Sequence, residues 1–223
     1  MNTRKYIAAA LLAAATLSAP AQEWIDTSDS DSFLTFGARV GFNTANATRG
    51  GEGTKANLDS WGTGFNAGVI ASINFNKAVS VQPGFFFQSR SHNYSYVTPV
   101  PDQPNMHEYG HTLYRTFQVP IMGVFTLHPG ENLAWSFEFG PYFQFGLSGS
   151  DKGTYEVALT ERAYKDGYFD HRKKFDFGFK FGTGVTVLEH YYLGLHYEAG
   201  TCSVWEDYGG RNKAWSFTVG YNF

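Results

Sequence analysis

The sequence has few of the features that stabilise or address many exported domains. Its 223 residues include one cysteine, Cys202, so an internal disulfide is impossible. We interpret that residue as a small side chain that fills space near a strand end. The chain also lacks any run of more than three Lys and Arg residues. Without Arg4 and Lys5, which we assign below to a cleaved segment, 15 basic residues stand against 20 acidic ones. This balance argues against nucleic-acid binding.

Long apolar runs are missing from most of the chain. After residue 21 no apolar stretch is long enough for a membrane-spanning helix, and no helical period of apolar residues competes with other patterns. If this part of the chain crosses a membrane, it must therefore cross as strands.

One apolar run stands at the beginning of the sequence. Arg4 and Lys5 precede the Ala/Leu-rich residues 7–17, and Ala-Pro-Ala at 19–21 fits a small-x-small cleavage site. We predict a secretory signal peptide at 1–21, cut before Gln22. A membrane-anchoring helix is the disfavoured alternative, because the run is shorter than the ~20 residues that a bilayer requires. The acidic, Ser-rich residues 22–32 are predicted to be a flexible leader.

The rest of the sequence alternates large apolar residues with small or polar ones. This period of two predicts strands that each have one apolar face. The last ten residues are the clearest case, with Trp215, Phe217, Val219, Tyr221 and Phe223 on one face. Eight segments follow the pattern and are predicted strands: 33–43, 61–75, 79–90, 113–127, 133–147, 174–188, 191–204 and 214–223.

The connections between these segments alternate in length. Short turns are predicted at 76–78, 128–132 and 189–190, and long loops at 44–60, 92–111, 148–173 and 205–212. Within the third long loop, residues 154–160 are a candidate extension of the neighbouring strands. An even strand number with this rhythm is typical of bacterial outer-membrane barrels. The sequence thus predicts an all-β fold, an eight-stranded antiparallel transmembrane β-barrel with up-and-down meander topology, formed by residues 33–223.

The second face of the strands separates a membrane barrel from a soluble β-sandwich or lipocalin-like barrel. It is mostly Gly, Ser, Thr, Asn and Gln, whereas a soluble protein would place many Lys and Glu residues there. Small uncharged residues suit the interior of a narrow barrel. The apolar face has no charge in the middle of its strands, where Lys or Arg would cost ~2–4 kcal/mol in a bilayer. Near strand ends this face carries the aromatic residues expected of interfacial girdles: Trp61, Trp135, Tyr191, Trp215, Tyr221 and Phe223.

The few charges of the second face are candidates for a site inside the barrel. They are Arg39, Arg90, Glu138, Asp176, Lys180 and Glu198. We predict that Arg39, Glu138, Lys180 and Glu198 form a polar network in the lumen. Buried charges must be paired to be tolerated, so we favour a network that fills a closed barrel. The alternative is a gated pore or a proton path.

Four short motifs resemble a known family. They are Phe-Gly-Ala-Arg-Val-Gly at 36–41, Phe-Gln-Val-Pro at 117–120, Gly-Pro-Tyr at 140–142 and Val-Gly-Tyr-Asn-Phe at 219–223. On these motifs the chain resembles the outer-membrane β-barrel family of PorT-like proteins, and more loosely the small OmpA-type barrels. The resemblance implies residence in the outer membrane. PorT itself is linked to a protein-secretion system, so membership of an envelope secretion or transport complex is a second functional hypothesis.

The end of the chain resembles the closing strand of outer-membrane barrels. In those proteins a terminal aromatic residue and the alternate apolar residues before it look like the signal that the barrel-insertion machinery reads. The resemblance implies that Trp215, Phe217, Val219, Tyr221 and Phe223 act as such a signal here. Predicted partners are therefore membrane lipid, the insertion machinery during biogenesis and envelope proteins that contact the aromatic-rich outer loops.

Two further clusters could carry chemistry. His92, His107, His111 and Glu108 share a predicted loop, and their side chains suit Zn²⁺. The spacing of His107 and His111 fits a helix, but their segment shows no helical pattern, so we favour a solvated loop and predict neither a metal nor a cofactor.

The second cluster, His171 with Asp170, could belong to a hydrolase or acyltransferase at the outer rim. No recognisable set of catalytic partners surrounds this pair in the sequence. We therefore predict that the protein is not an enzyme, and that its role is structural or partner-binding through the outer loops.

Overall fold

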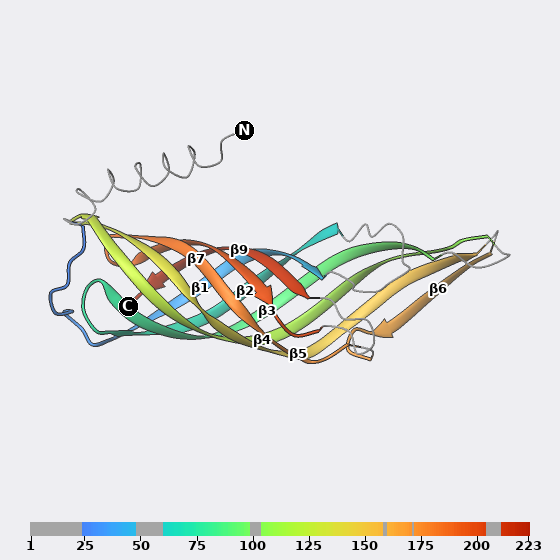
Figure 1. Ribbon diagram of the computed structural model, residues 1–223, viewed down its shortest axis with the longest axis horizontal. Helices are drawn as coiled ribbons and strands as arrows, with labels where there is room; N and C mark the ends of the chain where they lie inside the picture. Colours follow the sequence, from blue (N-terminus) through green and yellow to red (C-terminus); the bar gives the residue numbers. More distant parts are fainter. Residues whose placement is uncertain (1–23, 48–59, 99–103, 158–159, 171, 204–210) are drawn as a thin grey trace, which may run out of the picture.

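The computed structural model describes residues 24–47, 60–98, 104–157, 160–170, 172–203 and 211–223 (Figure 1). The predicted signal peptide and most of the loops at 44–60 and 205–212 lie outside these residues. Within them, nine strands are present: β1 (Leu34–Ala47), β2 (Ser60–Asn74), β3 (Val79–Thr98), β4 (Met106–Gly130), β5 (Leu133–Val157), β6 (Thr160–Gly167), β7 (Phe175–Val187), β8 (Tyr191–Gly200) and β9 (Asn212–Asn222). Among the described residues, no helix has the length and apolar character needed to cross a bilayer.

Eight of these strands close into a ring. All pairings are antiparallel, in the order β4, β3, β2, β1, β9, β8, β7, β5, and β4 also pairs with β5. First and last strands meet in a long ladder that runs from Gly37 opposite Asn222 to Ala47 opposite Asn212. The predicted eight-stranded antiparallel barrel is confirmed, and closure removes every free edge from its wall.

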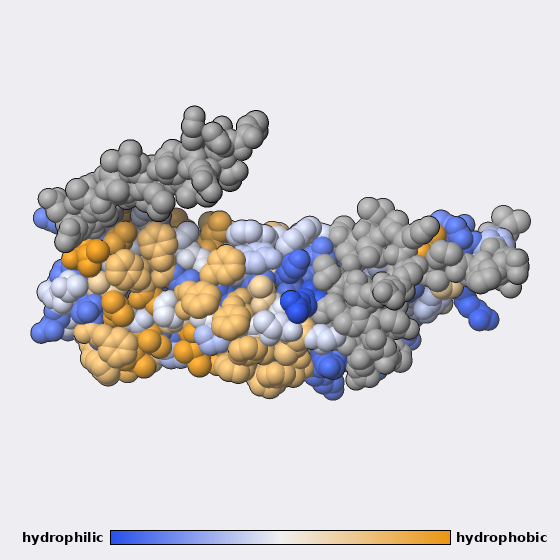
Figure 2. All heavy atoms as spheres, in the orientation of Figure 1, coloured by the Kyte–Doolittle hydropathy of each residue, from blue (hydrophilic) through white to orange (hydrophobic). Residues whose placement is uncertain are grey.

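The large apolar side chains of the wall point outward. Phe36, Val40 and Phe42 of β1 are each more than half exposed, as are Phe139 of β5 and Phe217 of β9. Figure 2 shows such side chains over the barrel strands. The six girdle aromatics of the sequence are exposed too: Trp61, Trp135, Tyr191, Trp215, Tyr221 and Phe223. Polar side chains occupy the alternate inward positions, as the period of two requires.

The predicted loop at 92–111 is wrong, and so is most of the loop at 148–173. β3 continues to Thr98, β4 begins at Met106, β5 continues to Val157 and β6 follows at Thr160. These segments form a sheet beyond the ring, which we call the outer sheet: residues 93–98 of β3, 106–114 of β4, 149–157 of β5, and β6 (Figure 1). The candidate extension at 154–160 is confirmed in part, because β5 includes 154–157 and β6 begins at Thr160. The other segments were not predicted because their alternation is polar rather than apolar, although Tyr, Val and Thr favour strands.

A β-bulge marks the passage from barrel to outer sheet. In the β4–β5 ladder, Arg115 pairs with Ser148 but Thr116 pairs with Gly146, so Leu147 is the extra residue. An extra residue reverses which side chains face inward. Gln144 faces the lumen below the bulge, and Asp151 is buried on the continuation of that face above it.

The opposite end of the ring carries the short turns and the end of β9. Residues 24–32 lie across these turns. The backbone N–H of Lys77 donates to Ser28 at 3.1 Å and that of His128 donates to Trp24 at 2.7 Å. Lys77 also lies 3.8 Å from Asp26. In a bacterial outer-membrane barrel the short-turn end faces the periplasm, so we call this end the periplasmic end and the other the outer end.

Candidate functional site

The centre of the lumen is spanned by an ion pair between opposite walls. Arg90 of β3 contacts Glu198 of β8, and these strands are four places apart in the ring of eight. Both side chains are 1% exposed. Glu198 also lies 3.2 Å from Lys180 and accepts a hydrogen bond from Gln118 at 3.0 Å. One carboxylate thus pairs with two cations and joins side chains from three other strands to β8.

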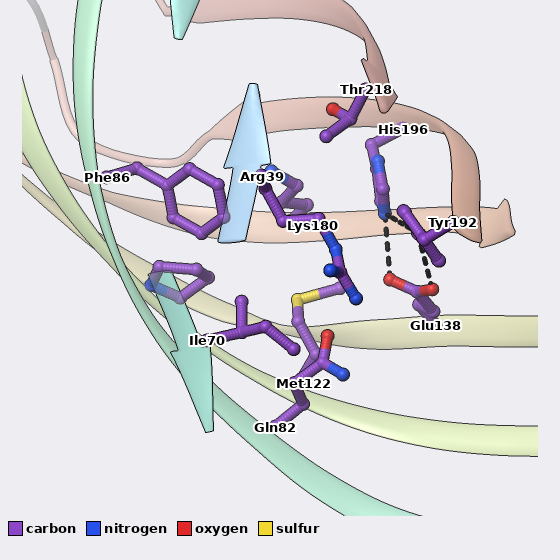
Figure 3. A pocket seen from close by; sticks show the side chains of 11 residues that line it. Arg39, Ile70, Gln82, Phe86, Met122, Glu138, Lys180, Tyr192, His196 and Thr218 are labelled. Carbon is purple, nitrogen blue, oxygen red and sulfur yellow. Dashed lines mark hydrogen bonds and ion pairs between the residues drawn. The ribbon is translucent and has the colours of Figure 1, made fainter. Parts of the chain in front are cut away.

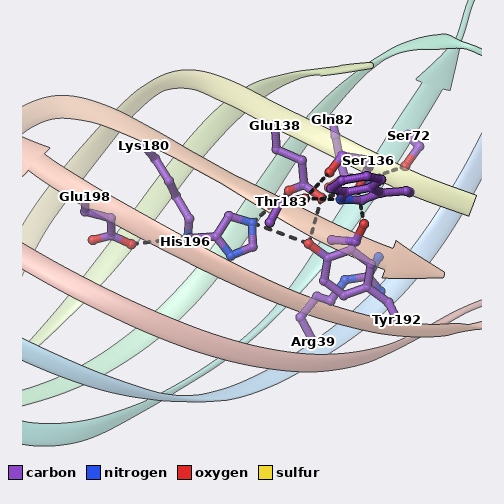
Figure 4. Close-up of polar contacts among 12 residues, drawn as sticks. Arg39, Ser72, Gln82, Ser136, Glu138, Lys180, Thr183, Tyr192, His196 and Glu198 are labelled. Atoms are coloured by element: carbon purple, nitrogen blue, oxygen red, sulfur yellow. Dashed lines mark hydrogen bonds and ion pairs between the residues drawn. The ribbon is translucent and has the colours of Figure 1, made fainter. Parts of the chain in front are cut away.

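A second cluster lies nearer the periplasmic end. Glu138 of β5 accepts from the Tyr192 hydroxyl at 2.7 Å and from Ser136 at 3.0 Å, and its other oxygen is 2.8 Å from His196 Nε2 (Figure 4). The guanidinium of Arg39 lies over the Tyr192 ring, 4.2 Å from its centre. Arg39 also donates to the Asn222 side chain at 2.7 Å.

Glycines make this second cluster possible. Glu138 is on β5 and its partners are on β8, with β7 between them. A Cβ on Gly184 of β7 would lie 2.4 Å from the Tyr192 ring, and one on Gly182 would lie 2.6 Å from His196. Because these positions have no side chain, Tyr192 and His196 reach across β7 to the carboxylate.

The four residues predicted to form one lumen network are all buried, but they lie in two groups. Lys180 and Glu198 pair directly, whereas Glu138 and Arg39 both contact Tyr192. A cavity of about 20 Å³ lies between the groups, lined by Arg39, Glu138 and Lys180 and by Ile70, Phe86 and Met122 among others (Figure 3). A water molecule needs about 10–15 Å³ on this measure. The lumen at this level therefore has room for little more than one water.

Sequence reasoning omitted Arg90 and His196, which lie within 4 Å of Glu198 and Glu138. Arg90 was recognised as an inward charge but left out of the predicted network, and His196 was not considered as a candidate. The signal for Arg90 was available, because it occupies an inward position of its strand. The contact of His196 with Glu138 depends on the missing side chain of Gly182, and alternation does not reveal such a gap.

The outer mouth of the lumen is covered by the segment that links β6 to β7. Tyr168 stacks on Tyr114 of β4, with ring centres 4.4 Å apart, and both are 2% exposed. Arg172 lies 4.3 Å over the Tyr168 ring and pairs with Asp151 of β5 at 2.8 Å. This aromatic and ionic layer closes the barrel above the Arg90 pair.

Above the mouth, tyrosines pack on the inner face of the outer sheet. Tyr94 of β3 and Tyr164 of β6 lie over Gly110 and Gly153 of the two central strands, and their hydroxyls contact each other. A Cβ on Gly110 would lie 2.3 Å from the Tyr94 hydroxyl, and one on Gly153 would lie 2.5 Å from that of Tyr164. Two glycines in register thus let side chains from the two flanking strands meet across the sheet.

Carboxylates and stacked rings complete this tyrosine cluster. Tyr94 donates to Asp151 at 2.6 Å and Tyr164 donates to Glu108 at 2.7 Å. Tyr94 stacks on Tyr96, and Tyr164 on Tyr155, with ring centres 5.4 and 4.6 Å apart. Burial is the main cause that raises the pKa of Tyr94 and of Tyr164, and the hydrogen-bonded carboxylates raise it further. Both phenols are therefore neutral at physiological pH.

The alternative metal ligands of the sequence do not face one another. His92 is buried on the inner face beside Thr112, at 2.9 Å, and Glu108 is bound to Tyr164 on that face. His107 and His111 are exposed on the outer face, four residues apart on one strand, which separates them by about 13 Å. In the described part of the chain, no three His, Cys, Asp or Glu side chains converge as metal ligands.

The alternative catalytic pair is described only in part. Asp170 accepts a hydrogen bond from the Gly167 backbone at 2.8 Å, as a turn-forming side chain does. His171 lies outside the described residues.

The residues of the predicted insertion signal share one face of β9. Trp215, Phe217, Val219, Tyr221 and Phe223 are all exposed on the outside of the barrel. Their role in biogenesis stays a prediction.

Comparison with known proteins agrees with this architecture. Residues 21–201 match the family described as outer membrane protein beta-barrel domain. The fold is that of an outer-membrane β-barrel protein, and the chain belongs to this family. A comparison with curated proteins finds no match.

Several solved barrels are similar at low sequence identity. The attachment invasion locus protein Ail of Yersinia pestis, solved with the heparin analogue sucrose octasulfate, is 13% identical, with a TM-score of 0.43, and the alignment covers 86% of this chain and 100% of Ail. Neisserial surface protein A is 11% identical, with a TM-score of 0.42 and coverage of 84% and 97%. OprG of Pseudomonas aeruginosa is 11% identical, with a TM-score of 0.34 and coverage of 89% and 99%.

Proposed function

We propose that this outer-membrane barrel is a closed, non-enzymatic anchor that presents the outer sheet to a protein partner outside the membrane. The main observation behind the proposal is the outer sheet itself, a packed surface that takes no part in closing the barrel wall. Its tyrosine cluster is hydrogen-bonded to Asp151 and Glu108, so the surface is held in one shape. A preorganised surface loses little entropy when a partner binds.

The edge of the sheet suggests how the partner docks. Within the described residues β6 pairs only with β5, so its other side presents unpaired backbone groups. Such an edge can accept an extended segment of another protein as an added strand. A shallow groove of about 500 Å³ lies on the face of the sheet across β4, β5 and β6, lined by Tyr109, His111, Lys152, Ala163 and Lys165 among others.

The closed lumen supports an anchoring role over a transport role. The Arg90–Glu198 pair spans the barrel, and the Tyr114–Tyr168 layer covers the outer mouth. An eight-stranded barrel leaves room only for side chains. We infer that ions do not pass, and that the lumen charges stabilise the barrel rather than gate it.

Site-specific photo-crosslinking in cells of the native host tests this function. A photoreactive residue replaces Ala163, which is exposed on β6, and a matched control replaces Val219, which is exposed on the barrel wall. We expect a discrete protein adduct from position 163 and lipid adducts from position 219. Tyr164→Phe, which removes two hydroxyl contacts from the cluster, should weaken the adduct while the barrel still folds. Identical adduct patterns at the two positions would contradict the proposal.

A second candidate function is a subunit of an envelope secretion or transport complex, as the PorT-like motifs imply. The feature that favours it is a hollow of about 610 Å³ at the periplasmic end, lined by the short turns and by residues 26–35. Asp26, Asp31, Glu131 and Glu189 make this hollow acidic, which suits a basic periplasmic partner. Purification from detergent-solubilised membranes distinguishes the candidates, because a complex subunit should co-purify with a fixed set of partners.

A further inference from the structure

The charges of β6 are not matched by the strand with which it pairs. In the β5–β6 ladder, Glu161 lies opposite Glu156 and Lys165 lies opposite Lys152. Like charges directly opposite each other destabilise a pair of strands. Both β6 side chains are exposed, and the ion pairs of the described residues involve neither of them. Oppositely charged partners for Glu161 and Lys165 would have to lie beyond the free edge of β6.

The backbone groups that this edge leaves free belong to three residues. The Tyr168 N–H donates to the Gly149 carbonyl of β5 at 3.2 Å, which continues the register of the β5–β6 ladder. Backbone groups alternate in direction along a strand, so even-numbered residues of β6 turn theirs toward β5 and odd-numbered residues turn theirs to the free edge. The N–H and the carbonyl of Gly167 are both bound to Asp170, at 2.8 and 3.2 Å. The free edge therefore consists of Glu161, Ala163 and Lys165.

These three residues are complementary to a second copy of themselves. When a second β6 runs antiparallel along the edge with Ala163 of the two copies opposite each other, Glu161 of each copy lies opposite Lys165 of the other. All three pairs are of the hydrogen-bonded kind, so each exchanges two backbone hydrogen bonds. Opposite charges in cross-strand positions stabilise such a pair. On the other face, Arg162 of each copy lies opposite the Tyr164 ring of the other, a contact that cations favour.

The sequence of β6 selects this register over the neighbouring ones. A slip by two residues in one direction places Arg162 opposite Arg162 of the second copy. A slip in the other direction places Glu161 opposite Gly167, whose backbone groups Asp170 already binds. Charged side chains often prevent association between sheet edges. Here the acid and the base stand two residues on either side of Ala163, so they confine self-association to one register.

An antiparallel contact at this edge points the two barrels in opposite directions. β6 runs roughly along the long axis of the molecule, beyond the outer end of the barrel (Figure 1). Ala163 pairs with Thr154, six residues along β5 from Ser148 at the bulge, which is about 20 Å along the strand. Copies in one membrane point the same way and cannot meet in this arrangement, whereas copies in two facing membranes can.

We propose that the free edge of β6 is a self-association site, at which this protein binds a second copy in the facing outer membrane of another cell. The charge match of Glu161 with Lys165 on either side of Ala163 identifies the occupant. The inference rests on the proposed function, because it names the protein partner of the outer sheet as a second copy of the chain. Each barrel then anchors one half of a contact between two cells.

Charge reversal tests the pairing with variants that keep β6 in place. Glu161→Lys removes the like-charge contact with Glu156, and Lys165→Glu removes the one with Lys152, so neither change weakens the β5–β6 ladder. Either variant alone places like charges opposite each other twice in the dimer. The dissociation constant of the dimer, measured by sedimentation of the full chain in detergent, should therefore rise at least about tenfold. The control Glu131→Lys, exposed at the periplasmic end, should leave it unchanged.

Mixing the two variants should restore the pairing. A Glu161→Lys copy presents two lysines and a Lys165→Glu copy presents two glutamates, so each charged pair between them is complementary. Vesicles of zwitterionic lipid that carry one variant should stay dispersed alone and aggregate when mixed with vesicles that carry the other. Vesicles with the unmodified chain should aggregate by themselves. Failure of the mixture to aggregate, or undiminished aggregation of either variant alone, would overturn the proposal.

Photo-crosslinking from position 163 separates this inference from the proposed function. Two populations of the native host carry the chain with different tags, and one of them carries the photoreactive residue. We expect an adduct that contains both tags. An adduct with a different protein would overturn self-association and leave the proposed function standing. Adducts between copies of one population only would overturn the facing-membrane arrangement, and the absence of any protein adduct would overturn both the inference and the proposed function.

Discussion

Removing the Glu198 carboxylate should strongly destabilise the barrel. Glu198 is 1% exposed and lies between Arg90 and Lys180, so Glu198→Gln leaves two buried cations without their counter-ion. Removal of one partner from a buried ion pair costs about 3–5 kcal/mol. The Gln amide still reaches Gln118, which keeps the shape of the site but not its charge. We therefore expect the free energy of unfolding to fall by about 3–5 kcal/mol.

The assay is urea unfolding of the full chain in lipid vesicles, followed by tryptophan fluorescence. Glu161→Gln on β6 is the matched control, because it makes the same chemical change at an exposed position and should change stability by less than about 0.5 kcal/mol. Adding Lys180→Met to Glu198→Gln removes one stranded cation, so it should recover about 1–3 kcal/mol. A loss below about 1 kcal/mol for Glu198→Gln would refute a dry, charge-paired lumen.

Three other outcomes follow from the same packing. Gly184→Ala should lower the free energy of unfolding by about 1–3 kcal/mol, because its Cβ would lie 2.4 Å from the Tyr192 ring. The control Gly130→Ala, whose Cβ would have nothing within 4 Å, should change the free energy of unfolding little in the same urea assay. Because the pKa of Tyr94 and of Tyr164 is raised in the folded protein, the outer sheet is most stable below the ordinary tyrosine pKa of about 10 and loses stability as the pH rises above it. Ultraviolet titration should show tyrosines that ionise above about pH 10, and fewer of them in Tyr164→Phe. Ionisation of all tyrosines near the ordinary pKa would contradict the packing of this cluster. Planar-bilayer recordings should show no steady conductance, and a stable open channel would contradict a filled lumen.

The barrel could be predicted from the sequence because its physical cause is local. A strand that meets lipid on one side and a packed lumen on the other must alternate at every second residue, as 214–223 do. The short turns were also predictable. The strand pairings of the structure confirm the eight predicted strands of the ring. Four of these strands, β1, β3, β4 and β5, extend beyond the ends predicted from the sequence.

The outer sheet could not be predicted in the same way. Its strands lie outside the hydrocarbon, so no apolar alternation marks them, and their order depends on cross-strand partners. The meeting of Tyr94 and Tyr164 requires Gly110 and Gly153 in register on two other strands. The inward position of Asp151 requires the bulge at Leu147. Both depend on pairing between segments rather than on sequence within one segment.

The lumen groups fall between these cases. Alternation identified Arg39, Glu138, Lys180 and Glu198 as inward residues, and all four are buried. Which of them contact each other depends on position along the barrel axis and on the gaps left by Gly182 and Gly184. Those quantities require the register of neighbouring strands, so the division into two groups became visible only in the structure.

The barrel depends above all on an apolar row of each strand that meets hydrocarbon and an intervening row that is packed inside. Spin labels at single cysteines along 215–221, in a Cys202→Ser background and in lipid vesicles, test this division most directly. We predict that labels at 215, 217, 219 and 221 collide with membrane-dissolved oxygen, and that labels at 216 and 218 collide neither with oxygen nor with a water-soluble nickel chelate. Equal accessibility at odd and even positions, or nickel contact at the odd ones, would contradict it.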